Sequence, residues 1–311
     1  MGFVALIFAL LIEQGRPLPA RNRITVGIEA YADAVRRGTD AGRGGHGVFG
    51  WCLIVGSLLA VLLLVQWGLS RIHPLALFCL YVAVLYWSVG FRQFSHAFTE
   101  IQLMLAAGDV GGARAVAQAW LGRHDPNLVV GDVPVHEICR LAIAHALVAT
   151  HRHVFGPLFW FILPLGAVGP VLYRVAQLLA DRWGGADDAY GEFARRAYFV
   201  LDWLPLRLSA AGFAVVGNFE DAVYCWRGAV AAGTGDDQRA LLLATGGGAL
   251  GLRLADAELE ARWATGGQGF DWQGPDPGAE GLRSAVGLVW RSVILWIALF
   301  AMLTVANWLG Q

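Results

Sequence analysis

"VFGWCLIVGSLLAVLLLVQWGLS", residues 48–70, is a continuous apolar stretch that contains no charged side chain. At 1.5 Å per residue, a helix of this length exceeds the roughly 30 Å thickness of a bilayer's hydrocarbon core. Trp51 and Trp67 lie near its two ends, where indole rings suit the headgroup interfaces. The stretch therefore predicts a transmembrane helix.

The composition of the whole chain agrees with this prediction. Apolar residues make up 57% of it and charged residues only 15%, whereas a typical soluble domain is about one quarter charged. We therefore expect an all-α, polytopic helical membrane protein.

The charged residues exclude several classes of function. A net charge of -1 and the lack of any arginine-rich run argue against a nucleic-acid partner. All 23 basic residues are arginine, so a Walker phosphate loop and a Schiff-base lysine are excluded. The four cysteines show no CxxC spacing, and we predict neither a disulfide framework nor a metal site.

Three further apolar stretches complete a prediction of four crossings within a single membrane domain over 1–311. The predicted spans are 1–13, 48–70, 75–91 and 284–310. The arginines are concentrated in the loops 13–47 and 92–283, which the positive-inside rule assigns to the cytoplasm. Within the second loop, helical spacing of apolar residues over 92–154 predicts amphipathic helices.

Residues 155–180 are apolar but repeatedly interrupted by proline and glycine. The interruptions are Pro157, Pro164, Gly166, Gly169 and Pro170. Irregular backbone at membrane depth persists only where protein or a watery cavity satisfies the freed peptide groups. We therefore favour a re-entrant or protein-buried helix pair over a simple span.

"LDWLPLRLSAAGFAVVG", residues 201–217, places one acid and one base around a proline in an apolar setting. Proline in a first turn predicts that a helix begins near Pro205, with Asp202 at the positive end of its dipole. A buried charge without a partner is costly. Asp202 and Arg207 are thus expected to pair with each other or with neighbouring helices, either as a structural ion pair or as part of a site.

Other polar residues in apolar surroundings extend this candidate site. Carboxylates suit metal or proton chemistry, and arginines suit an anionic or phosphorylated ligand. The candidate catalytic residues are Glu137, Asp202 and Glu220, and the candidate ligand-binding residues are His96, Glu100, His151, Arg174 and Arg207. We expect Arg174, Arg207, Asp202 and Glu137 to converge in one pocket on the cytoplasmic side.

Two other patterns are weaker signals. His151 and His153 are two residues apart and so lie on different faces of a helix, which favours a surface pair over a metal site. The glycines at 246–248 precede an apolar stretch that we predict to be a helix, and the N-terminus of this helix could bind a phosphate group. A plain loop or close helix packing is the preferred interpretation there.

Three segments together resemble the CobD/CbiB family and its AmpE-like relatives. They are "FGPLFWFILPLGAVGPVLYR" (155–174), "LDWLPLRLSAAGFAVVG" (201–217) and "GALGLRLAD" (248–256). "RIHP" (71–74) and the segment that begins "LAAGDVGGARAV" fit the same order. The resemblance covers most of the chain, and the ordered set carries it.

The resemblance to CobD/CbiB implies a bacterial inner-membrane enzyme of cobamide synthesis. Such an enzyme joins an aminopropanol, or its phosphate, to the propionate of adenosylcobyric acid, with ATP and Mg²⁺ as implied cofactors. The implied partners are a corrinoid or another phosphorylated or anionic small molecule, membrane lipid, and further copies of the chain. The AmpE-like alternative is a non-catalytic signalling protein linked to cell-wall state and β-lactamase induction. Transport is a weaker third alternative, because four spans provide little pathway.

Overall fold

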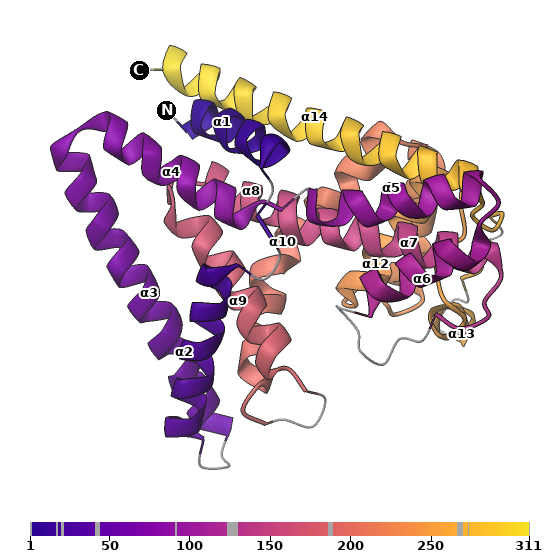
Figure 1. Cartoon of the computed structure of the whole chain (residues 1–311), viewed down its shortest axis with the longest axis horizontal. Helices are drawn as coiled ribbons and strands as arrows, with labels where there is room; N and C mark the ends of the chain where they lie inside the picture. The colour runs from indigo at the N-terminus through magenta and orange to yellow at the C-terminus, as the bar shows by residue number, and fades with distance from the viewer. Residues whose placement is uncertain are drawn as a thin grey trace. The chain divides into compact units, whose positions relative to one another are not determined.

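The computed structural model describes residues 2–16, 18–19, 22–40, 44–90, 92–122, 130–185, 189–265, 270–272 and 274–310. Throughout these ranges the regular structure is helical and contains no strand, which confirms the all-α prediction (Figure 1).

The chain folds into two compact units, each assembled from two separate stretches. Unit 1 comprises residues 1–93 and 156–205, and unit 2 comprises 94–155 and 206–311. The helices of unit 1 are α1 (Gly2–Gly15), α2 (Arg23–Thr39), α3 (Gly44–Ile72), α4 (Pro74–Ser88), α8 (Gly156–Ile162), α9 (Val168–Trp183) and the first part of α10 (Glu192–Val216). Unit 2 holds α5 (Arg92–Ala106), α6 (Val110–Leu121), α7 (Val135–Thr150), the π-helical turn η1 (His151–Phe155), the end of α10, α11 (Phe219–Ala231), α12 (Gln238–Leu250), α13 (Ala257–Thr265) and α14 (Ala279–Leu309).

Three described helices are long and apolar enough to cross a membrane: α3, α10 and α14. Helix α3 contains the predicted span 48–70, and α14 covers the predicted span 284–310 except for its last residue. The predicted spans 1–13 and 75–91 correspond to the shorter apolar helices α1 and α4. The residues of α10 lie in the loop 92–283, which is predicted to be cytoplasmic, so α10 is an additional candidate. The number of crossings and the side of each loop stay predictions.

The predicted helix start at Pro205 is wrong. Helix α10 runs without interruption from Glu192 to Val216, and Pro205 lies inside it. An internal proline removes one backbone hydrogen bond and strains the preceding turn, but packing against neighbouring helices lets apolar helices tolerate it. Asp202 and Arg207 therefore occupy the middle of a helix instead of its first turns.

The broken segment forms two helices of unit 1, and whether they are re-entrant stays a prediction. Helix α8 ends at Ile162 and α9 begins at Val168. In the connection, Gly166 adopts a left-handed backbone with φ of 60°, a conformation that suits glycine. The Ala167 amide donates a hydrogen bond of 3.1 Å to the side-chain oxygen of Gln66 in α3. A side chain thus satisfies a peptide group that the break leaves without a helical partner.

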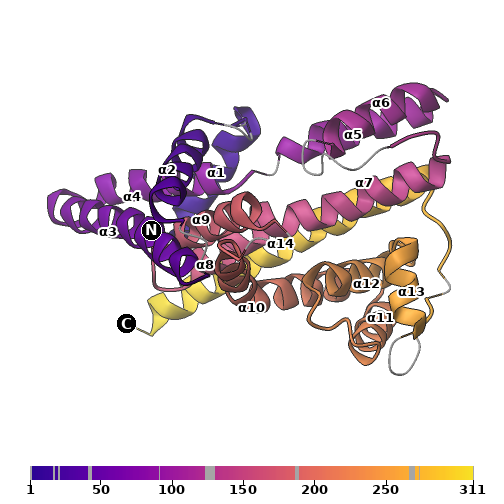
Figure 2. The ribbon, with the colours of Figure 1, turned by 90° about the horizontal axis from the view of Figure 1, so that it is seen from below.

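In unit 2, α7 lies along α14, and α12 packs against α7 and α11 (Figure 2). The glycines at 246–248 lie inside α12, so the expectation that they precede a helix is wrong, and the preferred interpretation of close packing is confirmed. A Cβ at Gly248 would lie 2.5 Å from the Asp221 carbonyl oxygen of α11, and one at Gly246 would lie 2.7 Å from Leu147 of α7.

The first prediction tests the contact between α11 and α12. Gly248→Ala should lower the free energy of unfolding by about 1–3 kcal/mol, because the new methyl group meets backbone that must move. Thermal unfolding of the detergent-solubilised protein measures this. The matched control is Gly287→Ala in α14, where a Cβ meets nothing within 4 Å and alanine's higher helix propensity favours stability. Equal melting temperatures for the two variants would contradict the packing argument.

Candidate functional site

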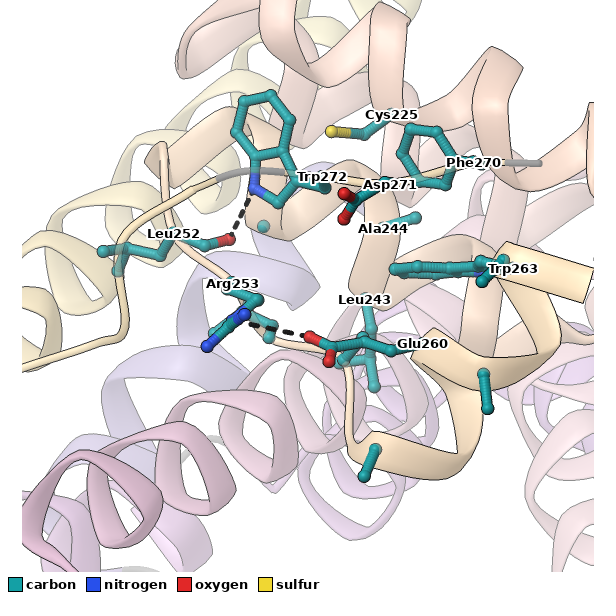
Figure 3. Close-up of a pocket in the computed structure, with 16 residues that line it drawn as sticks. Cys225, Leu243, Ala244, Leu252, Arg253, Glu260, Trp263, Phe270, Asp271 and Trp272 are labelled. Carbon is teal, nitrogen blue, oxygen red and sulfur yellow. Dashed lines mark hydrogen bonds and ion pairs between the residues drawn. The ribbon is translucent and has the colours of Figure 1, made fainter.

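Unit 2 contains a cavity of about 400 Å³ (Figure 3). Its walls come from α11, α12, α13, the connection between α12 and α13, and residues 270–272. Its volume falls within the usual range for small-molecule sites. The cavity is therefore the starting point for a functional site in this unit.

Aromatic rings form one wall of the cavity. Trp263, Phe270 and Trp272 line it, with 5.1 Å between the ring centroids of Trp263 and Phe270. Their positions are fixed, because Trp263 Nε1 donates to the Thr234 hydroxyl at 3.0 Å and Trp272 Nε1 donates to the Leu252 carbonyl at 3.1 Å. Both indole N–H groups are thus used inside the protein.

Charged groups lie at the same cavity. Arg253, Glu260 and Asp271 all line it. Arg253 donates through Nε and Nη2 to Asp276 Oδ1 at 3.1 and 2.7 Å, and its Nε lies 3.4 Å from Glu260 Oε1. The hydrogen bond to Asp276, followed by the charges of Glu260, Asp276 and Asp271, raises the pKa of Arg253. Arg253, the one basic residue that lines the cavity, is thus paired with carboxylates. The lining contains two acidic residues, Glu260 and Asp271.

The buried ion pair of α7 supports the wall beside this cavity. Arg140 Nε donates to Glu137 Oε2 at 2.7 Å, and Arg140 Nη1 donates to the Leu254 carbonyl at 3.4 Å. Leu254 lines the cavity. The hydrogen bond from Arg140 lowers the pKa of Glu137. The predicted residue Glu137 is therefore linked to the cavity wall through Arg140, and its catalytic role stays a prediction.

Asp202 and Arg174, which are the predicted site residues of unit 1, form hydrogen bonds with other side chains of this unit. Asp202 is 2% exposed and accepts a hydrogen bond of 2.8 Å from the Tyr173 hydroxyl, which lies 3.1 Å from the Tyr198 hydroxyl. Arg174 donates to the Gln177 side chain at 2.6 Å. This pattern agrees with the structural alternative for Asp202, and its catalytic role stays a prediction.

In unit 2, His151 departs from the expected surface pair. It is 1% exposed, and its Nδ1 lies 2.9 Å from the Ser209 hydroxyl of α10. The π-helical turn that begins at His151 changes the helix register, so the spacing rule of a regular α-helix does not place this side chain. Arg207 donates to the Gly235 carbonyl at 3.1 Å.

The remaining predicted residues lie at the surface. His96 and Glu100 are exposed on α5, and Glu220 is exposed in the first turn of α11. None of the eight predicted residues lines the cavity. Arg174 and Asp202 belong to unit 1 and Glu137 and Arg207 to unit 2, so the single pocket expected for these four stays a prediction.

The residues that line the cavity are not among those predicted from the sequence. Arg253 lies in "GALGLRLAD", which carried the family resemblance, and "FDW" (270–272) lies in the glycine-rich stretch after α13. The sequence pattern that could have indicated this cavity is the acidic residue Asp271 between the aromatic residues Phe270 and Trp272. Among the described residues, no group of three His, Cys, Asp or Glu side chains is placed to hold a metal ion.

Comparisons with known proteins match nearly the whole chain. The family model described as CobD/Cbib protein matches residues 4–306. A protein named cobalamin biosynthesis protein CobD from Chromobacterium violaceum is 33% identical over 94% of this chain and 93% of its own length. Another of that name from Stutzerimonas stutzeri is 31% identical over 95% of each chain. Cobalamin biosynthesis protein CbiB from Salmonella typhimurium is 25% identical over 68% of this chain and 67% of its own. No solved structure shows significant similarity.

The second prediction concerns the ion pair of Glu137 and Arg140. Glu137→Gln should lower the free energy of unfolding by about 1–2 kcal/mol at neutral pH, because it removes a charge-assisted hydrogen bond from a buried guanidinium. A carboxyl whose pKa is lowered by folding adds stability above its unfolded pKa, and this stability is lost as pH falls through the folded value. The gap between wild type and variant should thus close below the ordinary pKa of 4.5.

Thermal unfolding across this pH range measures the gap. Glu258→Gln, on the exposed side of α13, is the control and should follow the wild type. A Glu137→Gln difference that persists unchanged in acid would show that the pair is not the source of the stability.

Proposed function

The chain belongs to the CobD/CbiB family, and from this membership we propose that it forms the amide bond that the family resemblance implies. The bond joins an aminopropanol, or its phosphate, to the propionate of adenosylcobyric acid. The chain is a membrane protein of cobalamin biosynthesis. The bacterial inner membrane as its location and the cytoplasm as the side of its main polar loops are parts of the proposal.

The observation that carries the proposal is the continuity of the match. It extends from residue 4 to residue 306 and so includes every segment that builds the cavity. The relatives at 31% and 33% identity are matched over almost their full lengths. The relatives reported above bear CobD or CbiB names, which gives the AmpE-like alternative no support.

The reaction determines what the site must do. The amine loses a proton, and its nitrogen then attacks the carboxyl carbon. A C–N bond forms, a second proton leaves the nitrogen, and a C–O bond breaks. In the ATP-driven reaction that the resemblance implies, the departing oxygen leaves as part of a phosphate. The described residues offer no three-ligand group for Mg²⁺, so no step is assigned to a metal here. The protein must hold the amine beside the carboxyl group and exclude competing nucleophiles from it.

The cavity suits one of the two reactants. About 400 Å³ accommodates a small molecule but not a corrin macrocycle, which is several times larger. We therefore assign the cavity to the small reactant, with the corrinoid contributing only its propionate arm at the opening. Lipid contacts and a homo-oligomer stay predictions.

The third prediction tests the reaction directly. Membranes that contain the protein, supplied with adenosylcobyric acid, ATP, Mg²⁺ and either aminopropanol or its phosphate, should yield the corresponding amide, detected as a mass gain of amine minus water. The same gene should restore corrinoid synthesis from cobyric acid in a strain that lacks its own family member. Membranes without the protein are the control. Well-expressed protein that gives no product with either amine and no growth would refute the proposed function.

A further inference from the structure

We propose that the chain has a hinge where two of its helices pass from unit 2 into unit 1. Its two elements are the end of the π-helical turn η1 (His151–Phe155) and the part of α10 around Pro205. The motion changes the orientation of one unit relative to the other, while each unit keeps its own packing. It does not depend on the reaction that the chain performs.

Both helices are continuous across the boundary between the units. Residues 135–162 are helical throughout, because α7, η1 and α8 follow one another without a gap, and α10 is likewise uninterrupted. The boundary falls between Phe155 and Gly156 in the first helix and between Pro205 and Leu206 in the second. In each helix, the boundary therefore coincides with an irregularity of the α-helical hydrogen-bond pattern.

Each irregularity weakens its helix locally. Pro205 has no backbone N–H, so the Leu201 carbonyl loses its α-helical partner, and the proline ring crowds the same carbonyl. In η1 the hydrogen bonds join residues five apart instead of four, which widens the turn. Sharp bends in helices occur chiefly at prolines and at π-helical turns. Two such places at one boundary allow both helices to bend there.

On the side of unit 2, side-chain contacts hold the two helices together. His151 Nδ1 lies 2.9 Å from the Ser209 hydroxyl of α10, and both residues are at most 1% exposed. The Phe155 ring stacks on Trp296 of α14 with 5.7 Å between centroids, and its centroid lies 5.9 Å from that of Phe213 in α10. The turn η1 and the end of α10 therefore move with α14 as one body.

On the side of unit 1, the same two helices are joined through α9. Gly156 lies directly against the Tyr173 ring of α9, where a Cβ would collide with it. The Tyr173 hydroxyl donates to Asp202 of α10 at 2.8 Å. Bending is thus confined to the step from Phe155 to Gly156 and to the segment of α10 between Asp202 and Ser209.

The cavity of unit 2 lies entirely on one side of the hinge. Its lining lies within residues 225–272, all of which belong to unit 2. Hinge motion therefore leaves the walls of the cavity intact. Motions of this kind need only a few residues, within or at the ends of helices, to change their backbone conformation.

A rigid junction is the alternative, because neighbouring helices can support a proline or a π-helical turn without any motion. Support of that kind requires no particular place along a helix. Here both irregularities lie at the boundary between the units, with buried contacts on either side of each. This placement favours the hinge.

The fourth prediction tests the hinge with distances between two spin labels. Ala34→Cys in α2 of unit 1 and Ala231→Cys in α11 of unit 2 carry the labels at exposed positions. Cys52→Ser and Cys79→Ser remove the exposed native thiols. In lipid nanodiscs, double electron–electron resonance should give a broad distance distribution. Pro205→Ala should narrow this distribution, because alanine restores the missing backbone hydrogen bond.

Two controls define what is broad and what is specific. Labels at Ala34 and at Leu11, which is 64% exposed on α1, both lie in unit 1 and should give a narrow distribution in every variant. Pro170→Ala is the matched substitution, since Pro170 is also buried but lies in the first turn of α9, where a backbone N–H has no helical partner. It should leave the distribution between the units as broad as in the wild type.

Size-exclusion and circular dichroism profiles identical to those of the wild type establish that each variant is folded. A wild-type distribution between the units as narrow as that of the pair within unit 1 would overturn the proposal, and this measurement needs no change at Pro205. An unchanged width in Pro205→Ala would also overturn it. The labels report motion without any substrate, so a failure of the proposed amide formation would not alter the result.

Discussion

The structure depends on the pairing of its buried charges and of the peptide groups that helix breaks leave free. A chain with 57% apolar residues offers few partners, and a buried charge or peptide group without one is costly. The fold meets this need mainly with hydrogen bonds between segments that are far apart in the sequence. Tyr173 donates to Asp202, Arg140 joins Glu137 to the Leu254 carbonyl, and Gln66 accepts from the amide freed by the break before α9.

The cavity of unit 2 is organised by the same requirement. Its arginine is held by acids, and its indole N–H groups are bound to a hydroxyl and a carbonyl. Hydrogen bonds and ion pairs thus fix the walls of the cavity, and its volume suits the small reactant of the proposed amide formation.

The fold class could be predicted from sequence, because composition and long apolar stretches are local signals. Residues 48–70 and 284–310 needed no tertiary context. The position of Pro205 inside a helix could be found only from the tertiary structure. Proline begins many helices, but it is also tolerated inside a helix that neighbouring helices support. The burial of His151 was equally hidden, because the π-helical turn alters the spacing from which its exposure was predicted.

The cavity could not be predicted because it forms only when consecutive helices pack together. Its lining lies within residues 225–272, on α11, α12, α13 and the segments that follow α12 and α13, and no residue of it is distinctive alone. The predicted site was instead composed of charges in apolar surroundings. Several of these, such as Asp202 and His151, have partners inside the protein, which is what a structural role also requires.

The central claim is that this cavity binds the small reactant in a family member that we propose to form an amide. An electron cryo-microscopy structure of the protein in lipid nanodiscs, prepared with saturating 1-amino-2-propanol, tests it most directly. The account predicts density for the amine in the cavity of unit 2, between α11, α12 and α13. Density for the amine at another place, with this cavity filled by side chains of the protein, would contradict the account.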